Sequence, residues 1–142
     1  MEACDGVIIY GTKTGVELTS LGIPVIVAGE AWIRNKGVTT DATSAEDYFR
    51  ILDRLPFGQR MSADMITRAR KYAYHFFFRR MIPVTRVAPT GLKDPQFHID
   101  VSRLEDLLPE RDLGLDIICN GILKGTPFQY PAEHHRISGD VR

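Results

Sequence analysis

A turn flanked by glycines, Gly11-Thr12-Lys13-Thr14-Gly15, places several anion-binding groups at the start of an expected helix. Glycine lets the backbone approach a ligand closely, threonine hydroxyls donate hydrogen bonds, and lysine adds a positive charge. The first N–H groups of a helix are unpaired and lie at the positive end of its dipole. The set suits a phosphate or a carboxylate. It is neither a Walker A loop nor a GxGxxG motif, and the alternative is a turn that only connects a strand to a helix.

A polar loop carries a second set of candidate binding residues, which are Glu30, Trp32, Arg34, Lys36 and Gly37. Its charged side chains suit a substrate carboxylate or phosphate, and its tryptophan offers a stacking surface. Because charged loop residues are most often simply solvated, the alternative is a loop without a ligand.

Two strands and a short helix position both sets. Val7–Tyr10 is a continuous apolar run, which predicts a strand buried on both faces of a parallel sheet, and Pro24–Ala28 predicts a second strand. Between them, Thr14 and Glu17 have the spacing of a capping box, which predicts a helix that ends near Gly22. Such a βαβ unit binds ligands at the carboxyl ends of its strands. Glu17 therefore has two candidate roles, capping its own helix or accepting hydrogen bonds from a ribose.

The remaining chain predicts mostly helices. A polar loop of about 14 residues over 30–43 precedes a helix over 44–55, which Thr43 and Glu46 would cap, and Ser62 would cap a helix over 63–81. Further segments are a linker over 83–96, short helices over 102–107 and 113–123, and an irregular tail over 124–142. We expect one domain in two parts, a core with its following helix over 1–60 and the aromatic helix with an irregular helical segment over 61–142.

Composition gives no support for binding to nucleic acid or to an anionic membrane. Eighteen basic and eighteen acidic residues cancel among 142, so no overall field recruits nucleic acid or an anionic membrane. No run is long and apolar enough for a membrane span. The basic, aromatic helix over 63–81 has a nucleic-acid alternative through base stacking, but aromatic residues at helical spacing are more often a packing stripe. Because a buried-type strand begins within about six residues of Met1, we expect a piece of a larger α/β protein, or a sheet that another chain completes.

The run YGTKTGVELTSLGIPVIVAGEAWIRNKGVTTDATSAEDYFRIL resembles the C-terminal nucleotide-binding lobe of GT-B glycosyltransferases. It is more closely similar to the bacterial capsular polysaccharide synthesis and export family. The similar parts are the strand with its Gly/Thr turn, the helix with Glu and a closing LGxPVIV, the GEAWxRxKG loop, and D…S…Y at the start of the next helix. The resemblance covers about residues 5 to 55, a third of the chain.

The resemblance implies a nucleotide-sugar donor site. It places Thr12, Lys13 and Thr14 near the donor phosphate, Glu17 near the ribose, and the loop over 30–37 near the sugar or phosphate. In the capsular relatives the donor is often a cytidine nucleotide of an acidic sugar, which would suit the basic residues of both sets. A cytidine or uridine nucleotide sugar is therefore the expected substrate, and neither a metal ion nor another cofactor is expected.

The same resemblance implies what completes the enzyme. GT-B enzymes bind the acceptor with an N-terminal lobe and usually take their catalytic base from it, so no catalytic residue is assigned here and the chain is expected to be inactive alone. The implied partners are a nucleotide sugar, a glycan acceptor, and either the missing N-terminal lobe or a second copy of the chain. The expected location is the bacterial cytoplasm, peripheral to the inner membrane.

We therefore expect an α/β fold, a partial Rossmann-like βαβ core with a short parallel sheet, several packed helices and a helix-rich C-terminal half. The expected function is donor binding in a glycosyltransferase of capsular or cell-surface polysaccharide synthesis. Two alternatives stay open, which are an enzyme like a nucleotide-sugar epimerase and a non-catalytic interaction domain whose aromatic helix docks on a partner.

Overall fold

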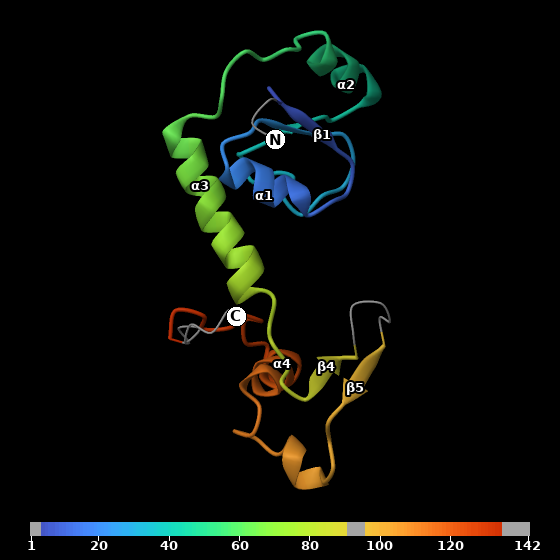
Figure 1. The fold of residues 1–142 in the computed structure, drawn as a ribbon, viewed down its shortest axis with the longest axis vertical. Coiled ribbons are helices and arrows are strands. Elements are labelled where there is room, and N and C mark those ends of the chain that lie inside the picture. The colour runs from blue at the N-terminus through green and yellow to red at the C-terminus, as the bar shows by residue number, and fades with distance from the viewer. Residues whose placement is uncertain (1–3, 91–95, 135–142) are drawn as a thin grey trace. The chain divides into compact units, whose positions relative to one another are not determined.

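The chain forms two compact units in a computed structural model that describes residues 4–90 and 96–134. We call Met1–Tyr74 the N-terminal unit and His75–Arg142 the C-terminal unit (Figure 1). The expected division after residue 60 differs from this boundary, because the helix that follows residue 60 packs on the first helix of the N-terminal unit.

A three-stranded parallel sheet is the centre of the N-terminal unit. Its strands are β1 (Val7–Ile9), β2 (Val25–Val27) and β3 (Thr40–Asp41), and their order is β1-β2-β3. Ile26 of β2 pairs with Ile8 on one side and with Thr40 on the other. The predicted α/β class with a short parallel sheet is confirmed, and all three strands end at the same edge.

Strand β2 is buried on both faces because a helix covers each of them. Helix α1 (Thr14–Ser20) approaches one face so closely that a Cβ placed on Gly15 would lie 3.7 Å from Val25. Ile26 points to the opposite face, since strand side chains alternate, and it packs with Ile51 of helix α2 (Ala45–Leu52). These contacts account for complete burial of the VIV segment.

The predictions for the other two strands need correction. Strand β1 is an edge strand with Ile8 44% exposed, so the expected burial on both faces is wrong. Strand β3 lies inside the stretch predicted to be a polar loop. Its two polar residues pair through the backbone alone, and therefore leave no apolar signal in the sequence. The loop before it is also anchored, because Ile33 and Val38 are buried.

The N-terminal cap of α1 differs from the predicted one. Lys13 is the N-cap residue of α1, and no side chain caps it, so the predicted capping box of Thr14 with Glu17 is wrong. The Thr12 hydroxyl instead accepts the backbone N–H of Thr14 at 3.2 Å. The turn thus satisfies one of its own helix-start donors.

Helix α2 begins one residue later than predicted. Ser44, and not Thr43, is its N-cap, and the Ser44 hydroxyl accepts the N–H of Asp47 at 3.1 Å. The Asp47 carboxylate in return accepts from both the N–H and the hydroxyl of Thr43. The capping pair therefore consists of Ser44 and Asp47, because Glu46 is one residue too early to reach back in this way.

Helix α3 (Ala63–Tyr74) starts at the predicted cap, since the Ser62 hydroxyl accepts the N–H of Met65 at 3.3 Å. It packs on α1 (Figure 1), and Arg70 donates to the backbone carbonyl of Ser20 at 3.1 Å. Beyond Tyr74 the chain continues as a π-helical segment, η1 (His75–Arg79), where a single helix to residue 81 was expected. The hydrogen bond of Arg70 shows that part of the basic surface of α3 stabilises its packing on α1.

The C-terminal unit combines a hairpin with helices. Strands β4 (Val87–Pro89) and β5 (Phe97–Ile99) pair antiparallel, so the predicted linker contains a strand. The short helix η2 (Leu104–Leu107) and α4 (Leu113–Lys124) lie close to their predicted bounds. Predictions for 91–95 and 135–142 lie outside the described residues. Within the described ranges, no helix is both long and apolar enough to cross a membrane.

Candidate functional site

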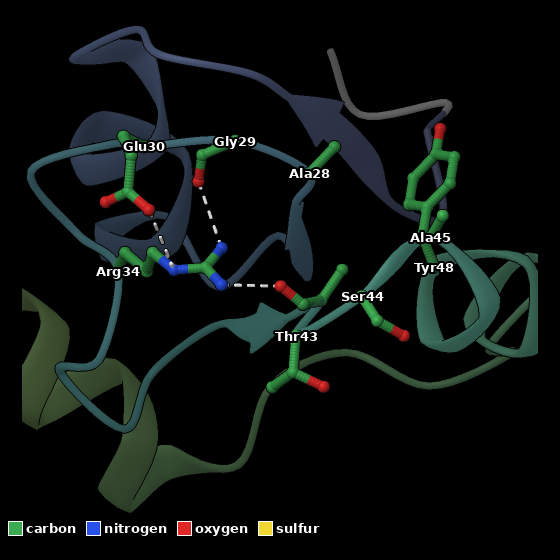
Figure 2. A pocket seen from close by; sticks show the side chains of 9 residues that line it. Ala28, Gly29, Glu30, Arg34, Thr43, Ser44, Ala45 and Tyr48 are labelled. Carbon is green, nitrogen blue, oxygen red and sulfur yellow. Dashed lines mark hydrogen bonds and ion pairs between the residues drawn. The ribbon is translucent and has the colours of Figure 1, made fainter.

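An open pocket of about 380 Å³ lies at the carboxyl ends of β2 and β3, beside the start of α2 (Figure 2). Three short segments line it. They are Ala28, Gly29 and Glu30 after β2; Ala42, Thr43 and Ser44 after β3; and Ala45 and Tyr48 of α2, together with Arg34. This is the sheet edge at which parallel α/β proteins bind ligands.

Arg34 holds the two strand ends together. Its guanidinium donates to the backbone carbonyl of Gly29 at 3.0 Å (Figure 2). It also donates to the carbonyl of Ala42, in the segment after β3. Its side chain is only 16% exposed and forms an ion pair with Glu30 at 3.7 Å, whereas the Glu30 side chain is 92% exposed. Arg34 thus uses its hydrogen bonds on the protein, while Glu30 reaches solvent at the pocket rim.

The start of α2 adds hydroxyls and a charged carboxylate beside the pocket. Hydrogen bonds from the backbone and the hydroxyl of Thr43 lower the pKa of Asp47, so this carboxylate is ionised at neutral pH. The Ser44 hydroxyl lies within 3.3 Å of the Glu46 carboxylate. The first N–H groups of α2, such as that of Ala45, have no intrahelical acceptor.

The glycine-flanked turn lies next to the loop that follows β2. A Cβ placed on Gly11 would lie only 3.0 Å from the carbonyl oxygen of Glu30, so the two predicted sets meet through these two residues. Thr12 and Lys13 are exposed, and Thr14 is half-buried. The hydroxyls of Thr12 and Thr14 lie 3.1 Å apart. The turn therefore presents polar side chains at the same sheet edge as the pocket.

Gly15 and Glu17 lie on opposite sides of α1. Gly15 is buried, and a Cβ there would lie 2.5 Å from Ile9 and 3.2 Å from Ile33, so the glycine permits close contact between helix and sheet. Glu17 is exposed and takes no part in a capping box. Its carboxylate is therefore accessible to a ligand.

The remaining predicted loop residues do not line the pocket, and each of them has a backbone or side-chain contact with α3. The Tyr72 hydroxyl donates to the backbone carbonyl of Trp32, and the Lys36 ammonium lies 5.9 Å from the centre of the Tyr72 ring. Arg68 donates to the carbonyl of Gly37. The pocket thus brings together Glu30 and Arg34 from the predicted loop set and leaves its other members on the α3 side.

No protein-family model, curated protein or solved structure matches this chain. The geometry of the site is therefore the only structural basis for assigning it a function.

Seven of the nine pocket residues were not among the predicted site residues, namely Ala28, Gly29, Ala42, Thr43, Ser44, Ala45 and Tyr48. The signal was present in the D…S…Y pattern, to which no role was assigned. The Asp41 carboxylate accepts from the N–H of Asn35 at 2.7 Å and orders the preceding loop, Ser44 caps α2, and Tyr48 both lines the pocket and packs on the core. These residues could not be placed at the sheet edge from the sequence, because strand β3 was not predicted.

The pocket can bind a polar ligand through carboxylate and hydroxyl acceptors together with backbone N–H donors. Across residues 4–90 and 96–134, no group of three His, Cys, Asp or Glu side chains is placed to hold a metal ion.

Proposed function

We propose that the N-terminal unit is the donor-binding part of a nucleotide-sugar-dependent glycosyltransferase of capsular or cell-surface polysaccharide synthesis, with a partial GT-B, Rossmann-like core. The donor would be a cytidine or uridine nucleotide sugar. A further lobe or a second copy of the chain would supply the acceptor site and the catalytic base. We place the enzyme in the cytoplasm, peripheral to the inner membrane.

One observation carries the proposal, the convergence of three loops at the carboxyl edge of a parallel sheet. The turn after β1 approaches the loop after β2 at Gly11 and Glu30, and Arg34 joins that loop to the chain after β3. Parallel α/β sheets bind nucleotides at this edge. The resemblance to nucleotide-sugar enzymes is a second support. It rests on the order in the sequence of the turn, the helix with Glu17 and the GEAWxRxKG loop.

The proposed chemistry is transfer of a sugar from a nucleotide leaving group. Negative charge develops on the phosphate as the glycosidic bond breaks, and Lys13 with the hydroxyl of Thr12 or Thr14 would stabilise it. Glu17 would accept hydrogen bonds from the ribose. All four side chains belong to the turn or to α1.

Titration of CMP, CDP, UMP and UDP against the protein tests the proposal. We expect binding that depends on the phosphate, weakened about tenfold by Lys13→Ala because a charged hydrogen bond is lost. Glu17→Ala should weaken it as well. Lys124→Ala removes the same charge from the end of α4 and should leave binding unchanged. Absence of binding at millimolar nucleotide would contradict the donor-site proposal and favour the interaction-domain alternative.

A second assay separates a transferase from an epimerase. The chain would be assayed together with its completing lobe or copy, and donor consumption would be followed with and without an acceptor glycan. A transferase consumes the donor only when the acceptor is present, whereas an epimerase converts the nucleotide sugar without it.

A further inference from the structure

The charged groups around the pocket leave it acidic toward a ligand. Arg34 is the one basic side chain that lines the pocket, and its guanidinium is directed to backbone carbonyls and to Glu30. Glu30 pairs with Arg34 but extends into solvent at the rim. On the first turn of α2, Asp47 is ion-paired with Arg50 at 3.3 Å, whereas Glu46 is exposed. Arg34 and Arg50 are each paired with one carboxylate, so an anionic group in the pocket would meet the charge of Glu46 and the exposed carboxylate of Glu30.

The hydrogen-bonding groups of the pocket match those of neighbouring sugar hydroxyls. Glu30 has a carboxylate that accepts, and the Thr43 hydroxyl, which donates to Asp47, has lone pairs left to accept. The N–H of Ala45 is a donor without an intrahelical acceptor. A pair of adjacent hydroxyls both donates and accepts, and Tyr48 with Ala28 adds apolar surface for the C–H face of a ring.

We propose that the pocket between β2, β3 and α2 binds the uncharged, hydroxyl-bearing part of a sugar and disfavours acidic sugars. The identification of this sugar as the donor's own rests on the proposed function. The resemblance implied an acidic sugar, which the basic residues Lys13, Arg34 and Lys36 would have suited. Arg34 instead donates to carbonyls, and Lys36 lies over Tyr72.

The test uses monosaccharides, so that its outcome does not depend on nucleotide binding. Methyl glucoside, methyl galactoside and methyl glucuronide are titrated against the isotope-labelled protein, and the backbone amide NMR shifts of residues 28–30 and 43–48 are followed. We expect at least one neutral glycoside to shift these amides with the millimolar Kd typical of so small a ligand. The glucuronide should bind about fivefold more weakly because of one unfavourable charge contact.

Glu30→Gln should remove most of the difference between the neutral and acidic sugars, because it removes the charge at the rim while keeping the size of the side chain. Glu105→Gln makes the same change on η2 and should leave the preference unaltered. Tighter binding of the glucuronide, or no shift of the pocket amides with either neutral glycoside, would overturn the inference. Pocket shifts with a neutral glycoside but no nucleotide binding would support the sugar pocket and contradict only the nucleotide-donor proposal.

Discussion

Arg34 determines the character of the pocket at the scale of single residues. A planar guanidinium with several fixed donors suits several backbone carbonyls at once, which a lysine ammonium does not. The carbonyls of Gly29 and Ala42 belong to segments that follow different strands, so this one side chain joins the two segments beyond the strands. It adds to the backbone pairing of β2 with β3, in which the N–H of Ala42 donates to the carbonyl of Val27 at 3.1 Å.

Arg34→Ala is expected to destabilise the N-terminal unit by about 2 kcal/mol, because charged hydrogen bonds are lost and partly buried carbonyls are left without a donor. Arg34→Lys should recover less than half of this loss. Urea unfolding followed by the fluorescence of Trp32, the single tryptophan, measures both effects. Arg50→Ala on the exposed side of α2 is the control, with an expected change below about 0.5 kcal/mol. Equal stability of Arg34→Ala and the native protein would contradict the bridging role.

Asp112 has a corresponding structural role in the C-terminal unit. Burial by itself would raise the pKa of its carboxyl, but hydrogen bonds from the Thr85 hydroxyl and from backbone N–H groups, including that of Leu115, hold the pKa below its ordinary value. A carboxyl whose pKa is lower in the folded state stabilises that state above its unfolded pKa of about 3.9. This contribution is lost as the pH falls through the lower, folded value.

We therefore expect α4 to lose stability between about pH 5 and pH 2, and Asp112→Asn to reduce this pH dependence by removing the titrating group. Urea titration followed through the amide NMR signals of α4 provides the measurement. Asp100→Asn, at an exposed position, serves as the control. An unchanged pH dependence in Asp112→Asn would show that other carboxyls cause the acid sensitivity.

At the scale of elements, the close contact of α1 with the sheet depends on a glycine. The β1–α1 turn leads directly into a helix whose first buried residue, Gly15, faces Ile9 and Ile33. The same glycine was expected to let the backbone approach a phosphate. Because Gly15 is buried, its role is in packing α1 against the sheet. The side chains of Thr12 and Lys13 are exposed and therefore accessible to a ligand.

Gly15→Ala should destabilise the N-terminal unit by up to about 2 kcal/mol. The added methyl group would overpack the contact with Ile9 at a cost of about 1–3 kcal/mol, of which the higher helix propensity of alanine offsets about 1 kcal/mol. Thermal unfolding followed by circular dichroism provides the measurement. Glu17→Ala on the exposed face of the same helix controls for propensity and is expected to be nearly neutral. A stabilised Gly15→Ala protein would mean that α1 has room to move outward.

At the scale of the whole molecule, two units with separate cores divide the chain. The N-terminal unit has its parallel sheet and the candidate site, whereas the C-terminal unit has a two-stranded hairpin and α4. The proposed donor site and sugar pocket both lie in the first unit. We therefore expect damage to the second unit to leave the folding of the first intact.

Gly114→Ala tests this expectation, since a Cβ on Gly114 would overlap the carbonyl oxygen of Pro83 and force α4 away from it. Hydrogen exchange with mass spectrometry should show lost protection over 75–90 and 96–134 and unchanged protection over 4–74. Gly125→Ala gives a milder change in the same unit, at a residue with a φ of 68° and open space around it. Loss of protection in both units together would show that they fold as one.

Much of the fold was predictable because its signals are local. The apolar runs around β1 and β2, the Ser62 cap and the segment that became α4 each depend on neighbouring residues, and the structure places elements there. Strand β3 was not predictable from Thr40 and Asp41, since their pairing uses only the backbone. The hairpin of β4 and β5 was missed for a related reason, because its three-residue strands show too few alternations to form a pattern.

The GTKTG turn and the 30–37 loop were identified as candidates by their residue types alone, and the sequence also predicted that they share one sheet edge. Only the tertiary structure decided which of their groups face a pocket. The physical reason lies in contacts between residues distant in the sequence. Arg34 donates to the carbonyl of Ala42, Tyr72 contacts the Lys36 ammonium and the Trp32 carbonyl, and the start of α2 lines one side of the pocket. Residue type determined what each side chain can bind, and packing determined which side chains remain free to bind it.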